Sequence, residues 1–298
     1  MPARFLVVPQ WQGSGSSRAM RLADGANAIA GDLPAAATTP VEVRIEAGES
    51  LGTGVRRFSS ISATAAQVRT ALSTFDDSET VFLIGGDCGA DVAAAARAAE
   101  KHPGLLLVWF DAHGDLHTPE SSPSGTFSGM VLRALLGDGA EGLATPAFAP
   151  ERVIHAGARA LDDAEAEYLA SSGIRSLTAA ELATPDALVA AAADAASASG
   201  ATRVYIHVDL DVLDPAVMEG VGYPEPFGVE VEQLTGAITA LRSRFELVGG
   251  AVTGFAPASA DAAASDLSAI LRVLSALTRP LPASPAPSPA PTTSPEEQ

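Results

Sequence analysis

The chain has 298 residues, a formal net charge of −18 and a hydrophobic content of 47%. The apolar content is sufficient for a buried core, whereas the negative charge would repel phosphates and excludes a nucleic-acid-binding protein. The single cysteine excludes an internal disulfide framework, and no apolar run reaches the roughly 18 residues that a membrane span needs. The first apolar run is also too short for a signal peptide, so we expect a cytoplasmic protein without a membrane anchor.

Short apolar or β-branched runs alternate with Ala- and Leu-rich segments along the chain. The runs predict strands at 4–8, 41–45, 80–84, 105–110, 152–157, 203–208 and 247–252. The segments between them predict helices near 20–28, 62–75, 89–100, 127–137, 163–172, 185–197, 230–243 and 260–278. Several strands are apolar on both faces, which indicates a sheet covered by helices on both sides. The alternation therefore predicts an α/β protein, a three-layer α/β/α sandwich with a mostly parallel sheet.

The pattern contains no linker and then changes near its end. The alternation predicts one domain over 1–278, with a surface loop at 137–151. From 279 to 298 prolines are dense and no apolar period exists. Such a segment buries too little apolar surface to offset its ordering entropy, so we predict a disordered Pro-rich tail.

Acidic and imidazole side chains follow two predicted strands. They are Asp111, His113 and Asp115 after 105–110, and Asp209 and Asp211 after 203–208. These side chains can converge, because the carboxyl ends of parallel strands meet at one edge of the sheet and alternate residues point the same way. Without a cation, four carboxylates and one imidazole in one crevice would be costly to desolvate. The donor set predicts hard divalent ions such as Mn²⁺, and four carboxylates are enough to bridge two of them.

The single cysteine, Cys88, follows a Gly-Gly-Asp turn after the predicted strand 80–84. Taken alone, this pattern fits a small buried thiol as well as a metal ligand. Two histidines lie within predicted strands. His155 is typical of a buried core histidine, whereas His207 shares the strand face of Asp209 and is a candidate neighbour of the ligands.

Three motifs together resemble one protein family. "GGDC" (85–88), "DAHGD" (111–115) and "HVDLDVLDP" (207–215) are similar in order and spacing to those of the ureohydrolases, which include arginase, agmatinase and formiminoglutamase. The resemblance covers about 1–278. It implies an arginase-like fold with a roughly eight-stranded sheet and Mn²⁺-dependent hydrolysis of guanidino or formimino groups. It also implies a homo-oligomer, either a trimer or a hexamer.

The resemblance implies six metal ligands and two Mn²⁺ ions. The ligands are Cys88, Asp111, His113, Asp115, Asp209 and Asp211. In the family, residues at the positions of Asp111 and Asp209 bridge the two ions, and the residue at Asp115 accepts a hydrogen bond from a bridging hydroxide that attacks the guanidino carbon. These three carboxylates are the implied catalytic residues. The family usually has histidine at Cys88, and a thiolate suits Mn²⁺ less well, so we predict weak or empty binding at that position.

The loop after the second motif has the length of the arginase loop that holds the substrate α-carboxylate. An ordinary polar loop is the alternative interpretation. A later segment, 157–165, keeps Arg159, Asp162 and Glu165 of the run that holds the α-amino group in arginases. The resemblance therefore implies a small guanidino substrate bound by His117, Ser122, Ser124, Thr126 and Asp162.

Two family residues are missing. Ser128 replaces a histidine that shuttles a proton, and Gly254 stands where the family has a glutamate that pairs with the guanidinium. Loss of an acid/base group typically lowers a rate by roughly 10²–10⁴-fold. We therefore expect an arginine-like substrate with a less basic guanidine, such as Nω-hydroxyarginine. The alternative is a catalytically impaired family member with a binding or regulatory role.

Overall fold

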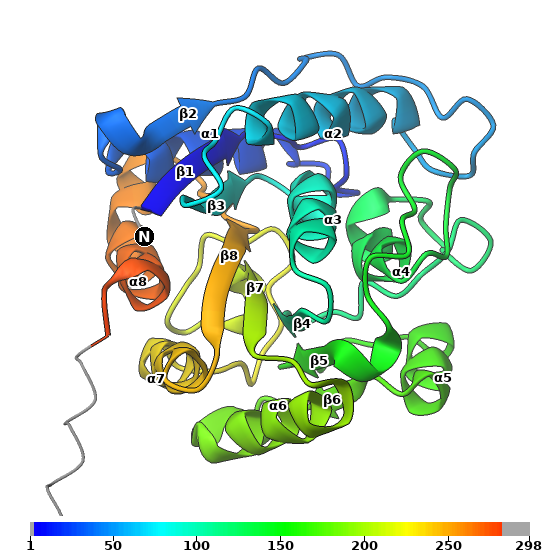
Figure 1. Ribbon diagram of the computed structural model, residues 1–298. Coiled ribbons are helices and arrows are strands. Elements are labelled where there is room, and N and C mark those ends of the chain that lie inside the picture. Colours follow the sequence, from blue (N-terminus) through cyan, green and yellow to red (C-terminus); the bar gives the residue numbers. More distant parts are fainter. Residues whose placement is uncertain (1–2, 282–298) are drawn as a thin grey trace, which may run out of the picture.

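The computed structural model describes residues 3–281, and the predicted tail from 282 onward lies outside the described residues (Figure 1). Eight strands form one sheet in which every pairing is parallel, in the order β2-β1-β3-β8-β7-β4-β5-β6. The strands are β1 (Ala3–Val8), β2 (Thr38–Pro40), β3 (Thr80–Gly85), β4 (Leu106–Phe110), β5 (Val153–Ala156), β6 (Arg175–Leu177), β7 (Arg203–Asp209) and β8 (Glu246–Thr253). The structure thus confirms the parallel α/β fold.

Helices cover both faces of the sheet. They are α1 (Met20–Gly31), α2 (Phe58–Leu72), α3 (Val92–Lys101), α4 (Val131–Leu135), α5 (Asp163–Ser172), α6 (Asp186–Ser199), α7 (Val231–Arg242) and α8 (Ala260–Thr278). Side chains of α1, α6, α7 and α8 share one hydrophobic core, and those of α2, α3, α4 and α5 share the other. Figure 1 shows α7 and α8 on one side of β7 and β8, with α3 and α4 on the other side.

The central strands are buried on both faces because their side chains alternate between the two cores. In β4, Leu106, Val108 and Phe110 pack into one core, whereas Leu107 and Trp109 pack into the other. The register between β4 and β7 pairs Phe110 with Val208. Both strands therefore end at the same level, which brings the residues that follow them to one edge of the sheet.

Two edge strands differ from the sequence-based prediction. The strand predicted at 41–45 is wrong, because β2 ends at Pro40 and the next segment leaves the sheet. The backbone carbonyl of Arg44 there accepts a hydrogen bond from the Gln12 side chain, and Ile45 is exposed. The short edge strand β6 was not among the predicted runs, since its three residues include the polar pair Arg175 and Ser176.

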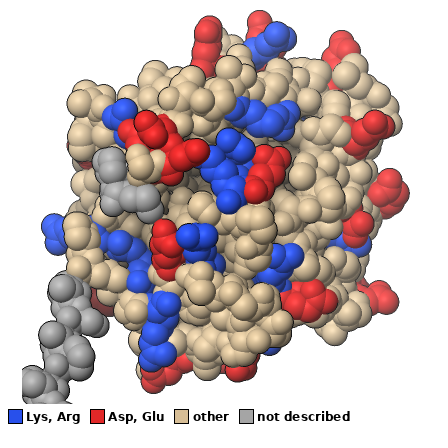
Figure 2. Space-filling view, in the orientation of Figure 1, with Lys and Arg blue, Asp and Glu red and all other residues tan. Residues whose placement is uncertain are grey.

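Other boundaries shift by a few residues. Helix α4 is shorter than the predicted 127–137, because Phe127–Met130 forms a 3₁₀ turn before it. No helix within residues 3–281 is long and apolar enough to cross a membrane. On the face shown in Figure 2, basic and acidic side chains are interspersed.

Candidate active site

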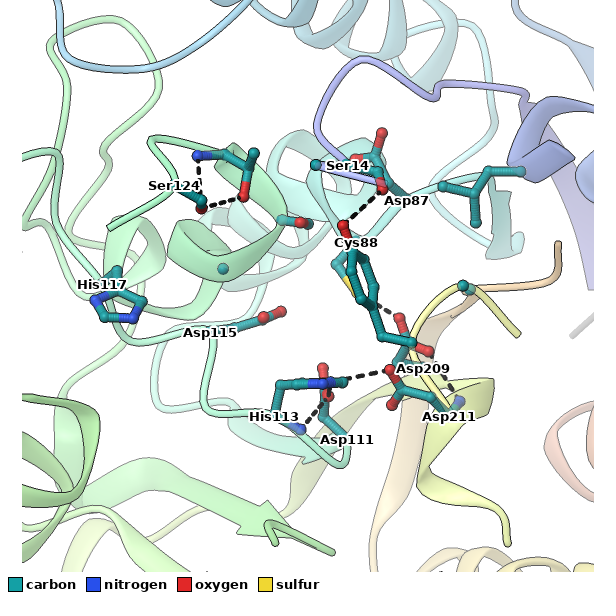
Figure 3. A pocket seen from close by; sticks show the side chains of 18 of the residues that line it. Ser14, Asp87, Cys88, Asp111, His113, Asp115, His117, Ser124, Asp209 and Asp211 are labelled. Atoms are coloured by element: carbon teal, nitrogen blue, oxygen red, sulfur yellow. Dashed lines mark hydrogen bonds and ion pairs between the residues drawn. The ribbon is translucent and has the colours of Figure 1, made fainter. Parts of the chain in front are cut away.

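The candidate site lies at the carboxyl ends of four neighbouring strands. β3, β8, β7 and β4 are adjacent in the sheet and lead into Cys88, Gly254, Asp211 and Asp111 respectively. All four residues line a cavity of about 320 Å³. Ligand sites of open parallel sheets lie at this edge, outside the carboxyl ends of the strands. Figure 3 shows side chains from several of these segments pointing into the cavity.

The structure brings together the side chains that the sequence singled out as ligands. All six line the cavity: Cys88, Asp111, His113, Asp115, Asp209 and Asp211. Of the residues expected to contact substrate, His117, Ser124 and Thr126 also line it, whereas Ser122 and Asp162 do not.

One group of possible ligands consists of Asp111, His113 and Asp211. The His113 Nδ1 atom lies 3.0 Å from Asp211 Oδ2 and 3.5 Å from Asp111 Oδ1. The His113 backbone N–H donates to Asp111 Oδ1, and the Ala112 N–H donates to Asp211 Oδ1, so both carboxylates are held in place by the chain itself. One ligand atom from each of the three residues lies within 4.8 Å of the others, which is close enough for one ion. Burial lowers the pKa of His113, but hydrogen bonds to Asp111 and Asp211 raise it to about 12.

The second group surrounds the thiol of Cys88, which is buried and also faces the cavity. Its Sγ atom donates to Asp209 Oδ2 at 2.8 Å, while Asp209 Oδ1 accepts the Asp211 backbone N–H. Burial, and then the carboxylates of Asp209, Asp115 and Asp111, raise the pKa of Cys88 well above its ordinary value. A cation beside the thiol is therefore needed to convert it to a thiolate ligand at neutral pH.

Asp115 provides the observation that tests whether a cation fits. Its Oδ2 atom is buried without a hydrogen-bond partner, although unpaired buried oxygens are uncommon in folded proteins. Its backbone φ is 53°, a left-handed conformation that costs a non-glycine residue on the order of 1 kcal/mol. A strained residue that holds an unpaired oxygen among other carboxylates fits a bound divalent ion.

The acidic cluster predicts how the metal-free protein responds to pH. Burial raises the pKa values of Asp87 and Asp209 to about 6. A raised carboxyl pKa stabilises the fold below the unfolded-state value near 4, and that contribution is lost as the pH rises through 6. Each such carboxyl then costs on the order of 3 kcal/mol at neutral pH. After chelation, we expect the melting temperature to fall between about pH 4 and 6.5, the interval that the unfolded-state and folded-state pKa values of these carboxyls span, as measured by calorimetry.

Saturating Mn²⁺ is the control for this pH dependence. The ion should neutralise Asp209 and reduce the loss of melting temperature over the same pH interval. A metal-free protein that gains stability as the pH rises would contradict the assigned pKa shifts.

Asp87 joins the N-terminal loop to the site. Its carboxylate accepts hydrogen bonds from the Gln10 side chain and from the backbone N–H groups of Gly13 and Gly89. A Cβ atom at Gly13 would lie only 2.2 Å from Asp87 Oδ1, so this close approach requires glycine. The contact holds Ser14 in the cavity wall.

The expected substrate loop is braced by its own hydroxyl groups. Ser122 Oγ accepts the Gly125 N–H, so Ser122 supports the loop from outside the cavity. Ser124 Oγ lies 2.7 Å from Thr126 Oγ1, and both of these hydroxyls line the cavity. The Asp162 carboxylate contacts the cavity residue His117, with 3.0 Å between Asp162 Oδ2 and His117 Nε2.

Two residues that the resemblance grouped with the substrate also make contacts that support the protein around the cavity. The Arg159 guanidinium donates to backbone carbonyls of the 211–213 turn and of 225–226, and thereby fixes the segment that follows Asp209. Asp162 caps the N-terminus of α5 in a capping box with Glu165.

Among the polar side chains that line the cavity, sequence reasoning missed Arg56 and Tyr223. Among the described residues that line the cavity, Arg56 is the one arginine or lysine. Its backbone N–H donates to the Gly125 carbonyl, which places it beside the serine-rich loop. The adjacent arginines at 56–57 after a glycine-containing turn were the available signal in the sequence.

The family model for the Arginase family matches residues 16–277. The chain belongs to the arginase family. The arginase of Bacillus subtilis is 35% identical over 156 residues, which cover 51% of this chain and 53% of that enzyme. The N(omega)-hydroxy-L-arginine amidinohydrolase of Streptomyces lavendulae is 30% identical over 192 residues, which cover 63% of this chain and 66% of that protein. The matches to the Bacillus arginases thus span about half the length of those proteins.

Solved arginases share the fold. The crystal structure of Entamoeba histolytica arginase in complex with L-ornithine matches 93% of this chain and 98% of that chain, with a TM-score of 0.80 and 20% identity. This likeness confirms the arginase-like architecture that the motifs implied.

Gly254 lies at the edge of the cavity, beside Asp209. Its φ is +88°, and a Cβ atom there would lie 2.1 Å from Asp209 Oδ1. Neither the backbone conformation nor the space accepts a larger residue without moving Asp209. The backbone at this point is therefore built around glycine.

Proposed function

We propose that the chain is a metal-dependent amidinohydrolase that cleaves a guanidino C–N bond of an arginine-like amino acid. The observation that carries this proposal is that six candidate ligands line one cavity, and that one of them, Asp115, has a buried oxygen without a hydrogen-bond partner. The oxygen-rich group of Asp111, His113 and Asp211 would hold Mn²⁺. Divalent ions, when bound, supply a water of lowered pKa as the nucleophile.

Asp115 is the residue that we assign to proton transfer. Its Oδ2 atom is buried without a hydrogen-bond partner, and the residue lines the cavity. Burial, and then the carboxylates of Asp111 and Asp209, raise its pKa well above the ordinary value. Such a carboxyl can hold a proton from the attacking water and deliver it to the leaving amine, which compensates for serine at position 128.

The proposed substrate has a less basic guanidine than arginine. A side chain at Gly254 would collide with Asp209, so no glutamate is available there to pair with a guanidinium. An N-hydroxyguanidine is less dependent on such a partner, and the Streptomyces lavendulae relative is named for Nω-hydroxy-L-arginine. We propose that this chain acts on the same class of substrate.

A substrate panel tests the proposed activity. Metal-loaded protein is assayed with arginine, agmatine, guanidinobutyrate and Nω-hydroxyarginine, and the release of urea or hydroxyurea is measured. We expect kcat/KM for hydroxyarginine to exceed that for arginine by at least about 10²-fold, the effect of one missing acid/base group. A preference for plain arginine would reject the proposed substrate class.

Arg56 predicts recognition of a substrate carboxylate. It lies beside Ser124 and Thr126 in an otherwise acidic cavity. A charge-assisted hydrogen bond contributes about 1.5–3 kcal/mol, so Arg56→Gln should raise KM for hydroxyarginine by roughly 10- to 100-fold. Agmatine lacks the carboxylate, and its KM should not change. Steady-state kinetics measure the KM for hydroxyarginine and for agmatine. Arg69→Gln, on the exposed side of α2, is the matched control. An equal change in KM for both substrates would contradict the assignment of Arg56.

A second candidate is a catalytically impaired family member with a binding or regulatory role. The Cys88–Asp209 hydrogen bond favours it, because this contact occupies a carboxylate that a metal would need. Metal analysis of protein purified with Mn²⁺ separates the two candidates, since a chain without bound metal supports the non-catalytic role. By family resemblance we also propose a trimer or hexamer, which analytical ultracentrifugation tests.

A further inference from the structure

His207 occupies a position behind the site that the proposed chemistry has not yet used. It is fully buried on β7, and the Trp109 ring stacks on it with 3.5 Å between ring centroids and 3° between planes. Its Nδ1 atom lies 2.8 Å from Asp91 Oδ2, and Asp91 Oδ1 accepts a hydrogen bond from the Tyr205 hydroxyl. With Nδ1–H donating to Asp91, the Nε2 atom keeps its lone pair for another partner.

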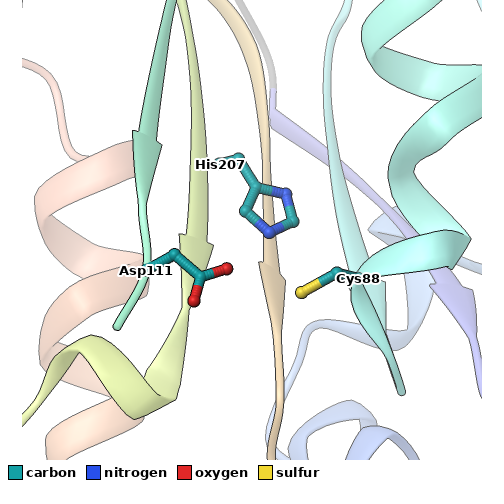
Figure 4. Close-up of side chains that lie close together, drawn as sticks. All are labelled: Cys88, Asp111 and His207. Atoms are coloured by element: carbon teal, nitrogen blue, oxygen red, sulfur yellow. The ribbon is translucent and has the colours of Figure 1, made fainter. Parts of the chain in front are cut away.

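The imidazole lies close to Cys88 and Asp111, behind the cavity that these two residues line. Figure 4 shows the imidazole between Asp111 and the thiol. Ligand atoms of Cys88, Asp111 and His207 all lie within 4.8 Å of one another. The Thr253 hydroxyl lies 3.3 Å from His207 Nε2 and 3.4 Å from Cys88 Sγ, so one small group bridges the imidazole and the thiol.

A carboxylate behind the imidazole is the arrangement that orients metal-binding histidines. Asp91 has no exposed surface, and it reaches His207 from the 3₁₀ turn (Cys88–Asp91) that also carries the cysteine. The same turn therefore supplies a thiol and the support for a histidine on another strand.

We propose that His207 on β7 provides an imidazole ligand in place of the histidine that the family usually has at position 88. Cys88, His207 and Asp111 would then form one metal position. Sulfur, nitrogen and oxygen ligands together favour Zn²⁺ and disfavour Mn²⁺. The site then binds two different ions, with Mn²⁺ on the Asp111–His113–Asp211 side and Zn²⁺ beside the thiol. This inference rests on the proposed function only in placing two cations in one cavity.

Cys88, His207 and Asp91 have the residue types of a Cys–His–Asp catalytic triad with a cysteine nucleophile. The charges around Cys88 argue against that role. Three carboxylates lie around Cys88, and its thiol donates to one of them, Asp209. Reactive thiolates lie in electropositive surroundings, whereas this thiol needs a cation to lose its proton. The metal ligand is therefore the role that fits the charge of the cavity.

Metal competition tests the inference on the full chain. Chelator-stripped protein is incubated with equimolar Mn²⁺ and Zn²⁺, dialysed and analysed by mass spectrometry for each metal. We expect about one ion of each kind per chain. Titration with Co²⁺, a spectroscopic substitute for Zn²⁺, should produce a near-ultraviolet thiolate-to-cobalt charge-transfer band. Two Mn²⁺ without Zn²⁺, and no such band, would overturn the inference.

Variants assign the ligands. His207→Gln should weaken Zn²⁺ binding at least 100-fold in a competition titration with a chromophoric chelator, and Cys88→Ser should abolish the cobalt band. Asp91→Asn, which leaves every proposed ligand in place, should weaken Zn²⁺ binding by about 10- to 100-fold, and it carries the test if His207→Gln does not fold. His155→Gln is the matched control, because His155 is equally buried on β5 but belongs to no candidate metal group among residues 3–281.

The outcomes separate this inference from the proposed function. Zn²⁺ affinity that survives both His207→Gln and Asp91→Asn overturns the role of His207, even if guanidino hydrolysis continues with Mn²⁺. Zn²⁺ binding that depends on His207, in a chain that hydrolyses none of the guanidino substrates, supports the metal position and rejects the proposed function.

Discussion

Asp115→Asn should lower kcat by about 10²–10⁴-fold while KM stays nearly constant. The carboxyl oxygen that lacks a partner is the group able to take and return a proton, and an amide cannot do so. Asparagine also tolerates the left-handed backbone at this position better than most residues, so the fold should be retained. Steady-state kinetics with the preferred guanidino substrate measure the change.

Metal analysis accompanies this measurement, because Asp115 is also a candidate ligand. The asparagine carbonyl oxygen can still coordinate an ion, so we expect metal content close to that of the parent protein. Asp138→Asn is the matched control, since Asp138 is an exposed carboxylate paired with Arg133. An Asp115→Asn variant with full metal and unchanged kcat would remove Asp115 from the reaction.

The central part of the fold was predictable because its strands are apolar on both faces. β4 and β7 lie between two cores, and their continuous hydrophobic runs follow from that position. The edge strands β2 and β6 were not predictable in the same way. Each has three residues, and its pairing is decided by the neighbouring strand and not by its own sequence.

In the candidate site too, residues at the ends of central strands were predictable, whereas the loop residue Arg56 was not. Asp111, His113 and Asp209 were predictable because they lie at or just after the ends of strands that the parallel sheet brings together. Arg56 reaches the cavity from a loop, and no periodicity places a loop residue against a sheet edge. The contact between Asp91 and His207 joins residues 116 positions apart, so only the folded chain reveals it.

Cys88→His should raise the Mn²⁺ content at saturating Mn²⁺ from about one ion to about two ions per chain. The substitution replaces a thiol, a soft ligand whose pKa is raised by burial, with an imidazole nitrogen, a ligand that suits Mn²⁺ better. It also removes the hydrogen bond to Asp209 Oδ2 and so frees that oxygen for the ion. The new ring has space to extend into the cavity that Cys88 lines.

The second ion should raise turnover without changing the order of substrates. In the proposed function, selectivity between arginine and hydroxyarginine depends on glycine at position 254. Cys88→His leaves that residue untouched, so the ratio of their kcat/KM values should hold. Cys88→Ser is the control of similar size, and it should gain no Mn²⁺ because a neutral hydroxyl is a poor ligand. Elemental analysis and the two kcat/KM values measure these effects. Unchanged Mn²⁺ stoichiometry in Cys88→His would show that position 88 does not ligate the ion. A switch of preference to arginine would show that the metal position, and not Gly254, controls the choice of substrate.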